Sequence, residues 1–185
     1  MLQHRSIHPG RLRQWTLLTL LILSLILSAC SGGQPATEAL SGAWVGKLEG
    51  SDAFVGIASN GEEVMAYICD GQTITQWFNG QAIPDKLELT SGSAKLQAQL
   101  SVDTANGSIT LADGQTYNFT ADRAAGDAGL YRLEEQTNDE SWISGWVVLN
   151  DGQLRGLRVS SKGTFETQSS LSTGAGRLDP DLKPY

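Results

Sequence analysis

Residues 94–100 read Ala-Lys-Leu-Gln-Ala-Gln-Leu, with an apolar side chain at every second position and a polar side chain between. Successive side chains of a strand point to opposite faces, so this alternation predicts a β-strand with one face in a core and one in water. The same period of two runs through residues 44–49 and 64–69. No window of helical length carries a comparable stripe with a period of 3.6 residues. The pattern therefore predicts an all-β fold.

Turn residues separate the alternating runs at short spacings. Asn-Gly and Asp-Gly dipeptides supply the positive φ that tight hairpin turns require. The turns expected on this basis are Asn60-Gly61, Asp70-Gly71, Asn79-Gly80, Asn106-Gly107, Asp113-Gly114 and Asn150-Asp151-Gly152. Between them we expect strands at 43–49, 53–59, 63–69, 73–79, 86–90, 94–101, 107–112, 115–120, 129–135, 142–149, 153–160 and 164–170. Such a series must hide its edges, so we expect an antiparallel meander closed into a single barrel or a two-layer sandwich.

The first 29 residues have the pattern of a signal peptide. Residues 1–13 carry three arginines and no acid, and residues 15–27 are almost wholly apolar. That run is shorter than the roughly 20 residues of a membrane-spanning helix. It ends in Leu27-Ser28-Ala29-Cys30, which resembles the lipobox of bacterial lipoproteins. The resemblance implies cleavage before Cys30 and a diacylglyceryl group on its sulfur; the alternative is an uncleaved N-terminal helix with an incidental cysteine.

These observations divide the chain into four parts. We expect an N-terminal signal helix at 1–29, a flexible tether at 30–41, an all-β domain at 42–171 and a disordered tail at 172–185. Two acyl chains anchor more firmly than one, which binds only reversibly. The predicted location is therefore the cell membrane or outer membrane, with the domain facing the periplasm or the exterior.

Composition excludes several function classes. The leader removes three of the 13 basic residues and none of the 20 acids, so the formal charge from residue 30 onward is −10. This charge repels phosphate backbones, and we expect no nucleic-acid partner. His4 and His8 both lie in the leader, which excludes catalytic triads with histidine and zinc sites that need one. Cys69 is left without a disulfide partner and is interpreted as a buried small hydrophobe. We expect neither a metal nor a cofactor.

Three resemblances bear on the mature domain. Gly42-Ala43-Trp44 is similar to the Gly-x-Trp signature of the calycins, which implies an up-and-down barrel with an internal ligand cavity. Residues 67–71, Tyr-Ile-Cys-Asp-Gly, resemble a segment of the membrane-bound inhibitors of C-type lysozyme, although the disulfide and the Ser-x-Ser-Gly-x-x-Tyr loop of those proteins are missing. Together with residues 129–132 and 145–152, this segment also looks like a group of uncharacterised exported bacterial domains.

Aromatic side chains are the candidate ligand-binding residues. Trp77 and Phe78 are adjacent, so in one strand they face opposite sides, and one of them must lie on a surface or in a pocket. Trp44, Trp77, Phe78 and Trp146 are the residues predicted to contact a ligand, with Trp142 and Tyr131 as further members of the group. Each of these residues either lines a pocket for an apolar or sugar ligand or belongs to the core.

Charged residues suggest weaker alternatives. Four arginines, Arg123, Arg132, Arg155 and Arg158, would clamp an anion if their strands adjoined. Arg155 and Arg158 are three residues apart, however, and should face opposite sides of a strand. The acid pairs Asp70 with Asp85 and Asp127 with Glu134 match no calcium loop or hydrolase motif.

The sequence thus predicts a lipid-anchored bacterial protein with a non-enzymatic β-domain that binds a ligand or partner. The membrane is the expected partner through Cys30, together with a protein or a small apolar ligand. Two alternatives remain open: a calycin-like carrier of a small apolar ligand, and an inhibitor of an external enzyme such as lysozyme.

Overall fold

The computed structural model describes residues 39–178 except Asn138. The predicted signal peptide, Cys30 and nearly all of the predicted tether lie outside the described residues, as do residues 179–185. Within the described part, no helix is long and apolar enough to cross a membrane.

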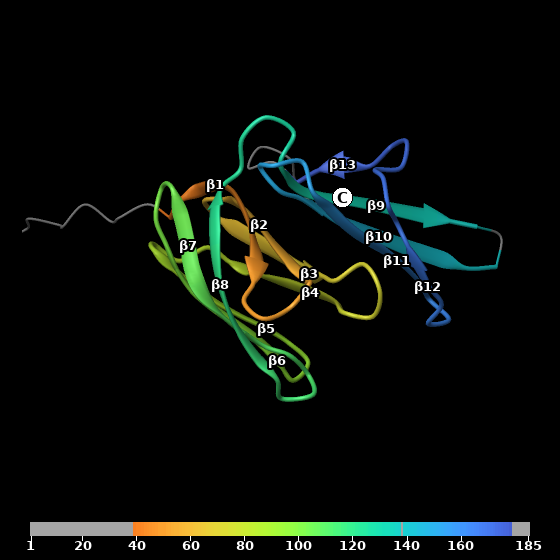
Figure 1. Cartoon of the computed structure of the whole chain (residues 1–185), viewed down its shortest axis with the longest axis horizontal. Coiled ribbons are helices and arrows are strands. Elements are labelled where there is room, and N and C mark those ends of the chain that lie inside the picture. Colours follow the sequence, from red (N-terminus) through yellow and green to blue (C-terminus); the bar gives the residue numbers. More distant parts are fainter. Residues whose placement is uncertain (1–38, 138, 179–185) are drawn as a thin grey trace, which may run out of the picture. The chain divides into compact units, whose positions relative to one another are not determined.

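Eight antiparallel strands form the first sheet (Figure 1). They are β1 (Ser41–Leu48), β2 (Phe54–Asn60), β3 (Glu63–Cys69), β4 (Thr75–Gln81), β5 (Lys86–Ser91), β6 (Ala94–Leu100), β7 (Thr104–Thr110) and β8 (Thr116–Arg123). Their order in the sheet is β4-β3-β2-β1-β8-β7-β6-β5. Because β1 pairs with β8, the meander curls into a nearly closed barrel whose two free edges are β4 and β5. We call the line between these edges the seam.

The second sheet has five strands in the order β12-β11-β10-β9-β13. They are β9 (Gly129–Gln136), β10 (Ser141–Val148), β11 (Leu154–Ser160), β12 (Phe165–Thr167) and β13 (Gly176–Arg177). This sheet packs on the outer face of β1–β3. The predicted all-β antiparallel meander is therefore confirmed, and the protein combines a barrel-like sheet with a second layer.

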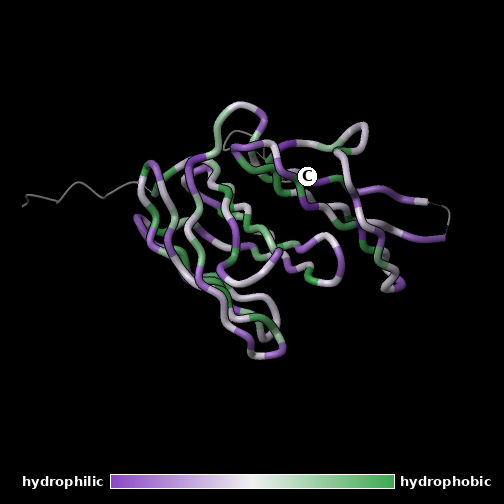
Figure 2. The backbone as a smooth tube through the Cα atoms, viewed as in Figure 1, coloured by the Kyte–Doolittle hydropathy of each residue, from purple (hydrophilic) through white to green (hydrophobic). Residues whose placement is uncertain are grey.

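Two hydrophobic clusters hold these layers together. The cluster inside the barrel contains Trp44, Leu48, Val55, Ile57, Ile68, Phe78, Leu96, Ile109 and Phe119, among others. The cluster between the layers contains Val45, Phe54, Tyr67, Cys69, Leu130, Val147 and Leu157. Strands β1–β3 are therefore buried on both faces. The expected alternation of a core face and a water face is wrong for residues 64–69, which are apolar at nearly every position because both faces of β3 pack in a core. Figure 2 shows hydrophobic residues along these inner strands and hydrophilic residues toward the far ends of β9 and β10.

Two of the six predicted turns are wrong. Asn79-Gly80 lies inside β4 and Asn106-Gly107 inside β7, and neither glycine has a positive φ. A Cβ on Gly80 would lie 2.5 Å from the Leu89 side chain, and one on Gly107 would lie 2.6 Å from Cβ of Ala98. Gly107 permits close packing between the paired strands β6 and β7, and Gly80 permits the close approach of β4 and β5 across the seam. Neither glycine reverses the chain.

The predicted disordered tail is also wrong in part. Gly176 and Arg177 form β13 and pair with β9, and the N–H of Leu178 donates to the carbonyl of Leu130. The low apolar content of residues 172–185 suggested disorder, but backbone pairing with the edge of β9 and packing of Leu178 against the cluster between the layers order this short segment.

Candidate binding groove

Trp77 and Phe78 lie on opposite faces of β4, as the sequence predicts. Phe78 is fully buried inside the barrel, whereas Trp77 is half-buried on the outer face. Trp77 is therefore the member of the pair that a ligand outside the barrel can reach.

The indole of Trp77 is held between two other side chains. Its ring stacks on Tyr67 of β3 with centroids 4.1 Å apart and an interplanar angle of 25°. The guanidinium carbon of Arg132, on β9, lies 4.7 Å from the Trp77 centroid, and Nε of Arg132 also donates to Glu134 at 3.0 Å. A ring with a stacked aromatic and a stacked cation is fixed in orientation.

A groove of about 420 Å³ opens beside this stack. Its lining residues are Thr75, Gln76, Trp77, Ser91, Ser141, Ile143, Val159, Ser160 and Ser161. One wall is the beginning of β4 together with the end of β5, and the other wall is the face of β10 and β11 that turns toward the barrel. The groove thus lies between the two layers, where neither sequence neighbourhood nor periodicity alone would place it.

The second-sheet wall continues as a row of apolar side chains that we call the ledge, formed by Ile143, Val159 and Phe165. The strand register places Ile143 opposite Val159 and Val159 opposite Phe165, so the three side chains share one face. Ile143 is 37% exposed and Phe165 is 51% exposed. The ledge is therefore an apolar surface that the barrel leaves uncovered.

Titratable groups next to the groove are not activated for chemistry. Burial raises the pKa of the Tyr67 hydroxyl, which lies 3.0 Å from the Thr75 hydroxyl. Burial likewise raises the pKa of the Cys69 thiol. Both groups are therefore protonated at neutral pH and are poor nucleophiles.

The other predicted ligand contacts lie elsewhere. Trp44 is fully buried in the barrel, where its Nε1 donates to the Ser101 carbonyl at 3.2 Å. Trp146 is fully buried on the opposite face of the second sheet, where a Cβ on Gly156 would clash with its ring. Of the four residues proposed from the sequence, only Trp77 borders the groove. The ledge residues were not among the ligand contacts predicted from the sequence. A single apolar residue in a strand carries no sequence signal that distinguishes an exposed position from a core position.

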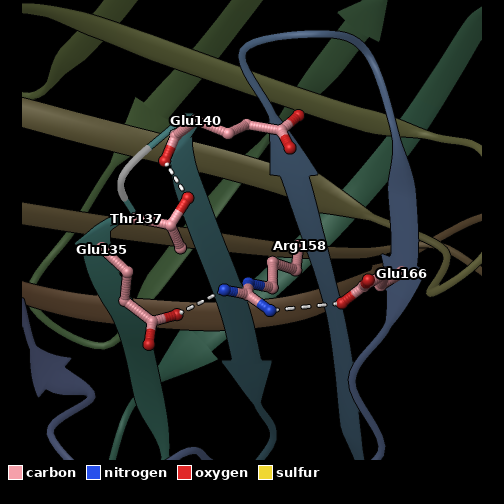
Figure 3. A network of polar contacts seen from close by, with 5 residues as sticks. All are labelled: Glu135, Thr137, Glu140, Arg158 and Glu166. Carbon is pink, nitrogen blue, oxygen red and sulfur yellow. Dashed lines mark hydrogen bonds and ion pairs between the residues drawn. The ribbon is translucent and has the colours of Figure 1, made fainter.

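The four arginines do not form an anion clamp, because each lies over a different aromatic ring. The guanidinium carbons of Arg123, Arg132, Arg155 and Arg158 lie 4.9, 4.7, 4.8 and 4.2 Å from the ring centroids of Trp44, Trp77, Phe54 and Trp142, respectively. Their charges serve to pack the chain's aromatic residues and are not gathered for a ligand. Figure 3 shows Arg158 on the outer face of the second sheet, between Glu135 and Glu166.

The acid pairs also remain apart from any site. Asp70 lies in the turn before β4 and Asp85 in the turn after it, so the two are separated by the length of the strand. Among the described residues, no group of three or more His, Cys, Asp or Glu side chains is placed to hold a metal ion.

A second hollow, about 570 Å³ and shallow, lies on the outer face of β5–β8. Its side chains are mainly amides, hydroxyls and the charged pair Lys86 and Glu88. It contains no aromatic residue, so the groove beside Trp77 is the better candidate for a binding site.

Comparisons with protein-family models, with curated proteins and with solved structures find no match for this chain. The fold and the groove therefore define the protein only as a two-layer all-β domain with an open groove between its layers.

Proposed function

We propose that this protein is a lipid-anchored bacterial lipoprotein whose β-domain binds a ligand or partner in the groove beside Trp77. The observation that carries the binding role is the groove itself, in which a fixed indole, an exposed apolar ledge and several hydroxyls converge from both layers. The anchor rests on the lipobox Leu27-Ser28-Ala29-Cys30.

The position of the groove suits a tethered binding protein. Ser41, where the described chain enters β1, pairs with Asn60, the last residue of β2. Strand β3 begins at this same end of the sheet, where it pairs with Gln81, the last residue of β4. The groove begins at Thr75, at the other end of β4. Seven strand residues span roughly 20 Å. The groove therefore opens at the end of the barrel away from Ser41, where the described chain enters β1.

Binding is favoured over catalysis by the chemistry available. No histidine follows residue 8, and the phenol and thiol nearest the groove are held protonated by burial. General acid–base or nucleophilic catalysis needs a group with a pKa tuned toward neutrality or an activating base, and neither lines the groove.

The packed barrel interior favours an external site over the internal cavity of a calycin-like carrier. Several large side chains inside the barrel have no surface that water can reach, either from outside or from an internal cavity large enough for a water molecule. They are Trp44, Phe78, Leu96 and Ile109. These side chains border no such space, so a ligand inside the barrel would have to displace them at considerable cost.

Detergent partitioning tests the anchor. The full chain expressed in a bacterial host should enter the detergent phase of a cloud-point separation, and Cys30→Ala should move it to the aqueous phase. Cys69→Ala is the matched control and should stay with detergent. Aqueous behaviour of the unaltered protein would contradict the proposal.

Site-specific photo-crosslinking in intact cells tests the groove. A benzophenone amino acid at Ser161, on the groove wall, should give a discrete adduct, whereas the same group at Thr120, on the outer face of β8, should not. Equal labelling from both positions, or adducts from Thr120 alone, would argue against a binding role for the groove.

A further inference from the structure

The free edge of β4 is part of the groove. The N–H of Asp70 donates to the carbonyl of Ile74, and the N–H of Ala82 donates to the carbonyl of Glu62. These bonds show which residues of β4 direct their backbone N–H and C=O groups toward β3. They are the even-numbered residues, because hydrogen-bonded pairs alternate along an antiparallel ladder. Thr75 and Trp77 therefore direct their backbone N–H and C=O groups away from β3, toward the seam.

Strand β5 does not satisfy these groups with a backbone ladder, because β4 and β5 are the two ends of the sheet order. A side chain takes part of that role. Nε2 of Gln76 donates to the carbonyl oxygen of Trp77 at 3.1 Å and to the hydroxyl of Ser91, on β5, at 2.9 Å. The Gln76 amide thus occupies, at one acceptor, the place that the N–H of an added strand would take.

The walls of the groove suit the two faces of an extended peptide. Side chains on one face of such a peptide would meet the ledge residues Ile143 and Val159, and those on the other face would meet Ser91 and Gln76. A strand presents alternate side chains to opposite sides, so this surface selects apolar residues at every second position.

Two further observations favour a polypeptide with basic residues. The ring of Trp77 already has Tyr67 and Arg132 stacked against it, which leaves no free face for a sugar ring. Exposed carboxylates lie near the ledge: Glu134, which is ion-paired with Arg132, lies opposite Ile143 in the β9–β10 register, and Asp139 lies two residues before Ser141. On a chain of strongly negative charge, these acids attract Lys and Arg.

We propose that the groove binds an extended segment of a partner protein, which adds to the free edge of β4 as a further strand and carries apolar residues at alternate positions together with Lys or Arg. This proposal rests on the binding function proposed above and specifies its ligand class. Gln76 acts as a latch that protects the edge until the segment displaces its amide, in keeping with the protection that exposed strand edges require.

A random dodecapeptide library displayed on phage, panned against the full chain in detergent, tests the proposal. Enriched peptides should carry apolar residues at alternate positions, include Lys or Arg, and lack proline at their centre. In a synthetic copy of one such peptide, N-methylation of the amides at alternate positions should weaken binding at least tenfold, and methylation at the intervening positions should have little effect. Only pairing along one strand edge produces this alternation.

Matched variants locate the binding. Ile143→Ser should weaken peptide binding at least tenfold, whereas Val102→Ser, which alters an apolar side chain with 62% exposure away from the groove, should leave it unchanged. Gln76→Ala should tighten binding a few-fold, because the competing amide is removed. Both altered apolar side chains are solvent-exposed, so their loss should not prevent folding.

Failure to enrich any peptide, binding that is indifferent to Ile143→Ser, or a uniform response to N-methylation would overturn the strand-addition proposal. The adduct from Ser161 distinguishes this result from failure of the broader proposal. A Ser161 adduct without peptide binding would retain the groove as a binding site and remove only the extended peptide as its ligand.

Discussion

Gly145 of β10 lies directly against Trp77 of β4, so that a Cβ added to Gly145 would come within 2.5 Å of Cζ2 of the indole. The same Cβ would lie 2.7 Å from the Tyr67 ring. The second sheet and the barrel therefore approach each other closely at this glycine, and the Tyr67–Trp77 stack fills the space that a side chain would occupy.

Gly145→Ala should consequently destabilise the protein. The added methyl must push the aromatic stack out of place, and overpacking of this kind costs about 1–3 kcal/mol. The free energy of unfolding in urea, followed by tryptophan fluorescence, measures the loss. Gly176→Ala is a matched control, because a Cβ there meets no atom closer than 3.8 Å and should have a small effect. Equal effects of the two substitutions would show that close packing at Gly145 is not the cause.

Phe78→Ala should lower the free energy of unfolding by about 3–5 kcal/mol, because the ring is fully buried inside the barrel and its removal leaves a cavity. Asn79→Ala, on the neighbouring exposed position of β4, should change stability by less than about 0.5 kcal/mol. Chemical denaturation of both variants tests this. A mild effect of Phe78→Ala would mean that the barrel interior is less tightly packed than its burial indicates.

Periodicity and turn chemistry were sufficient to predict the strands and the all-β class, since alternation at 94–100 recurs as β6 with its predicted inward face. They were insufficient for the layers. A strand buried on both faces, such as β2, shows a continuous apolar run. Such a run does not reveal whether a face is covered by another sheet or by the far side of the same barrel. The turns predicted at Gly80 and Gly107 were wrong for a related reason. The sequence does not distinguish a glycine needed for close approach between strands from a glycine needed for a turn.

The groove was partly predictable. Adjacent Trp77 and Phe78 required one of the two aromatic side chains to leave the barrel core, and this inference follows from strand geometry alone. The ledge depends on the register that aligns Ile143 with Val159 and on the overlap of the two sheets. Both are long-range relationships that a single sequence does not encode in any local pattern.

Acid should weaken the turn between β3 and β4 through Asp70. Burial alone would raise the pKa of Asp70, but its Oδ1 accepts hydrogen bonds from the N–H groups of Gln72, Thr73 and Ile74, and together these hold the pKa below its ordinary value of 3.8. A depressed folded-state pKa stabilises the protein above the unfolded-state pKa, and this contribution is lost as the pH falls through the folded-state value.

Two substitutions separate the charge from the hydrogen bonds. Asp70→Asn keeps an Oδ1 acceptor and should lose only the pH-dependent part, so its stability difference from the unaltered protein should shrink as the pH falls below about 3.8. Asp70→Ala removes every acceptor and should cost about 2 kcal/mol at neutral pH. Urea unfolding across the pH range measures both. A difference between Asp70→Asn and the unaltered protein that does not change with pH would contradict the assigned pKa shift.

Cys69 should be unreactive in the folded protein. Its side chain is fully buried, and burial raises the pKa of its thiol, so both access and thiolate are lacking. In a Cys30→Ser background, a thiol reagent such as dithionitrobenzoate should report no reaction under native conditions and one thiol in denaturant. Rapid modification of the folded protein would show that the space between the layers opens far more readily than its packing suggests.

Arg158 should stabilise the outer face of the second sheet by a modest, salt-dependent amount. Its guanidinium lies 3.1 Å from a carboxylate oxygen of Glu135 and 3.3 Å from one of Glu166, and it stacks over Trp142 (Figure 3). The arginine side chain is 24% exposed and both carboxylates are about half exposed, so each ion pair contributes less than about 1 kcal/mol. The stacking interaction adds about 0.5–1 kcal/mol.

Arg158→Ala should therefore cost about 1–2 kcal/mol at low ionic strength, where it also leaves two carboxylates without their shared cation. Arg158→Lys keeps the charge but cannot reach both carboxylates with a planar fork, and it should recover only part of the loss. At 1 M salt the screening length is about 3 Å, so the ion-pair part should fall and the stacking part should remain. Lys95→Ala, on the solvent face of β6, serves as the control for removing one positive charge. If Lys95→Ala were equally costly, or if salt left the Arg158→Ala effect unchanged, the loss would not come from the pairs with Glu135 and Glu166.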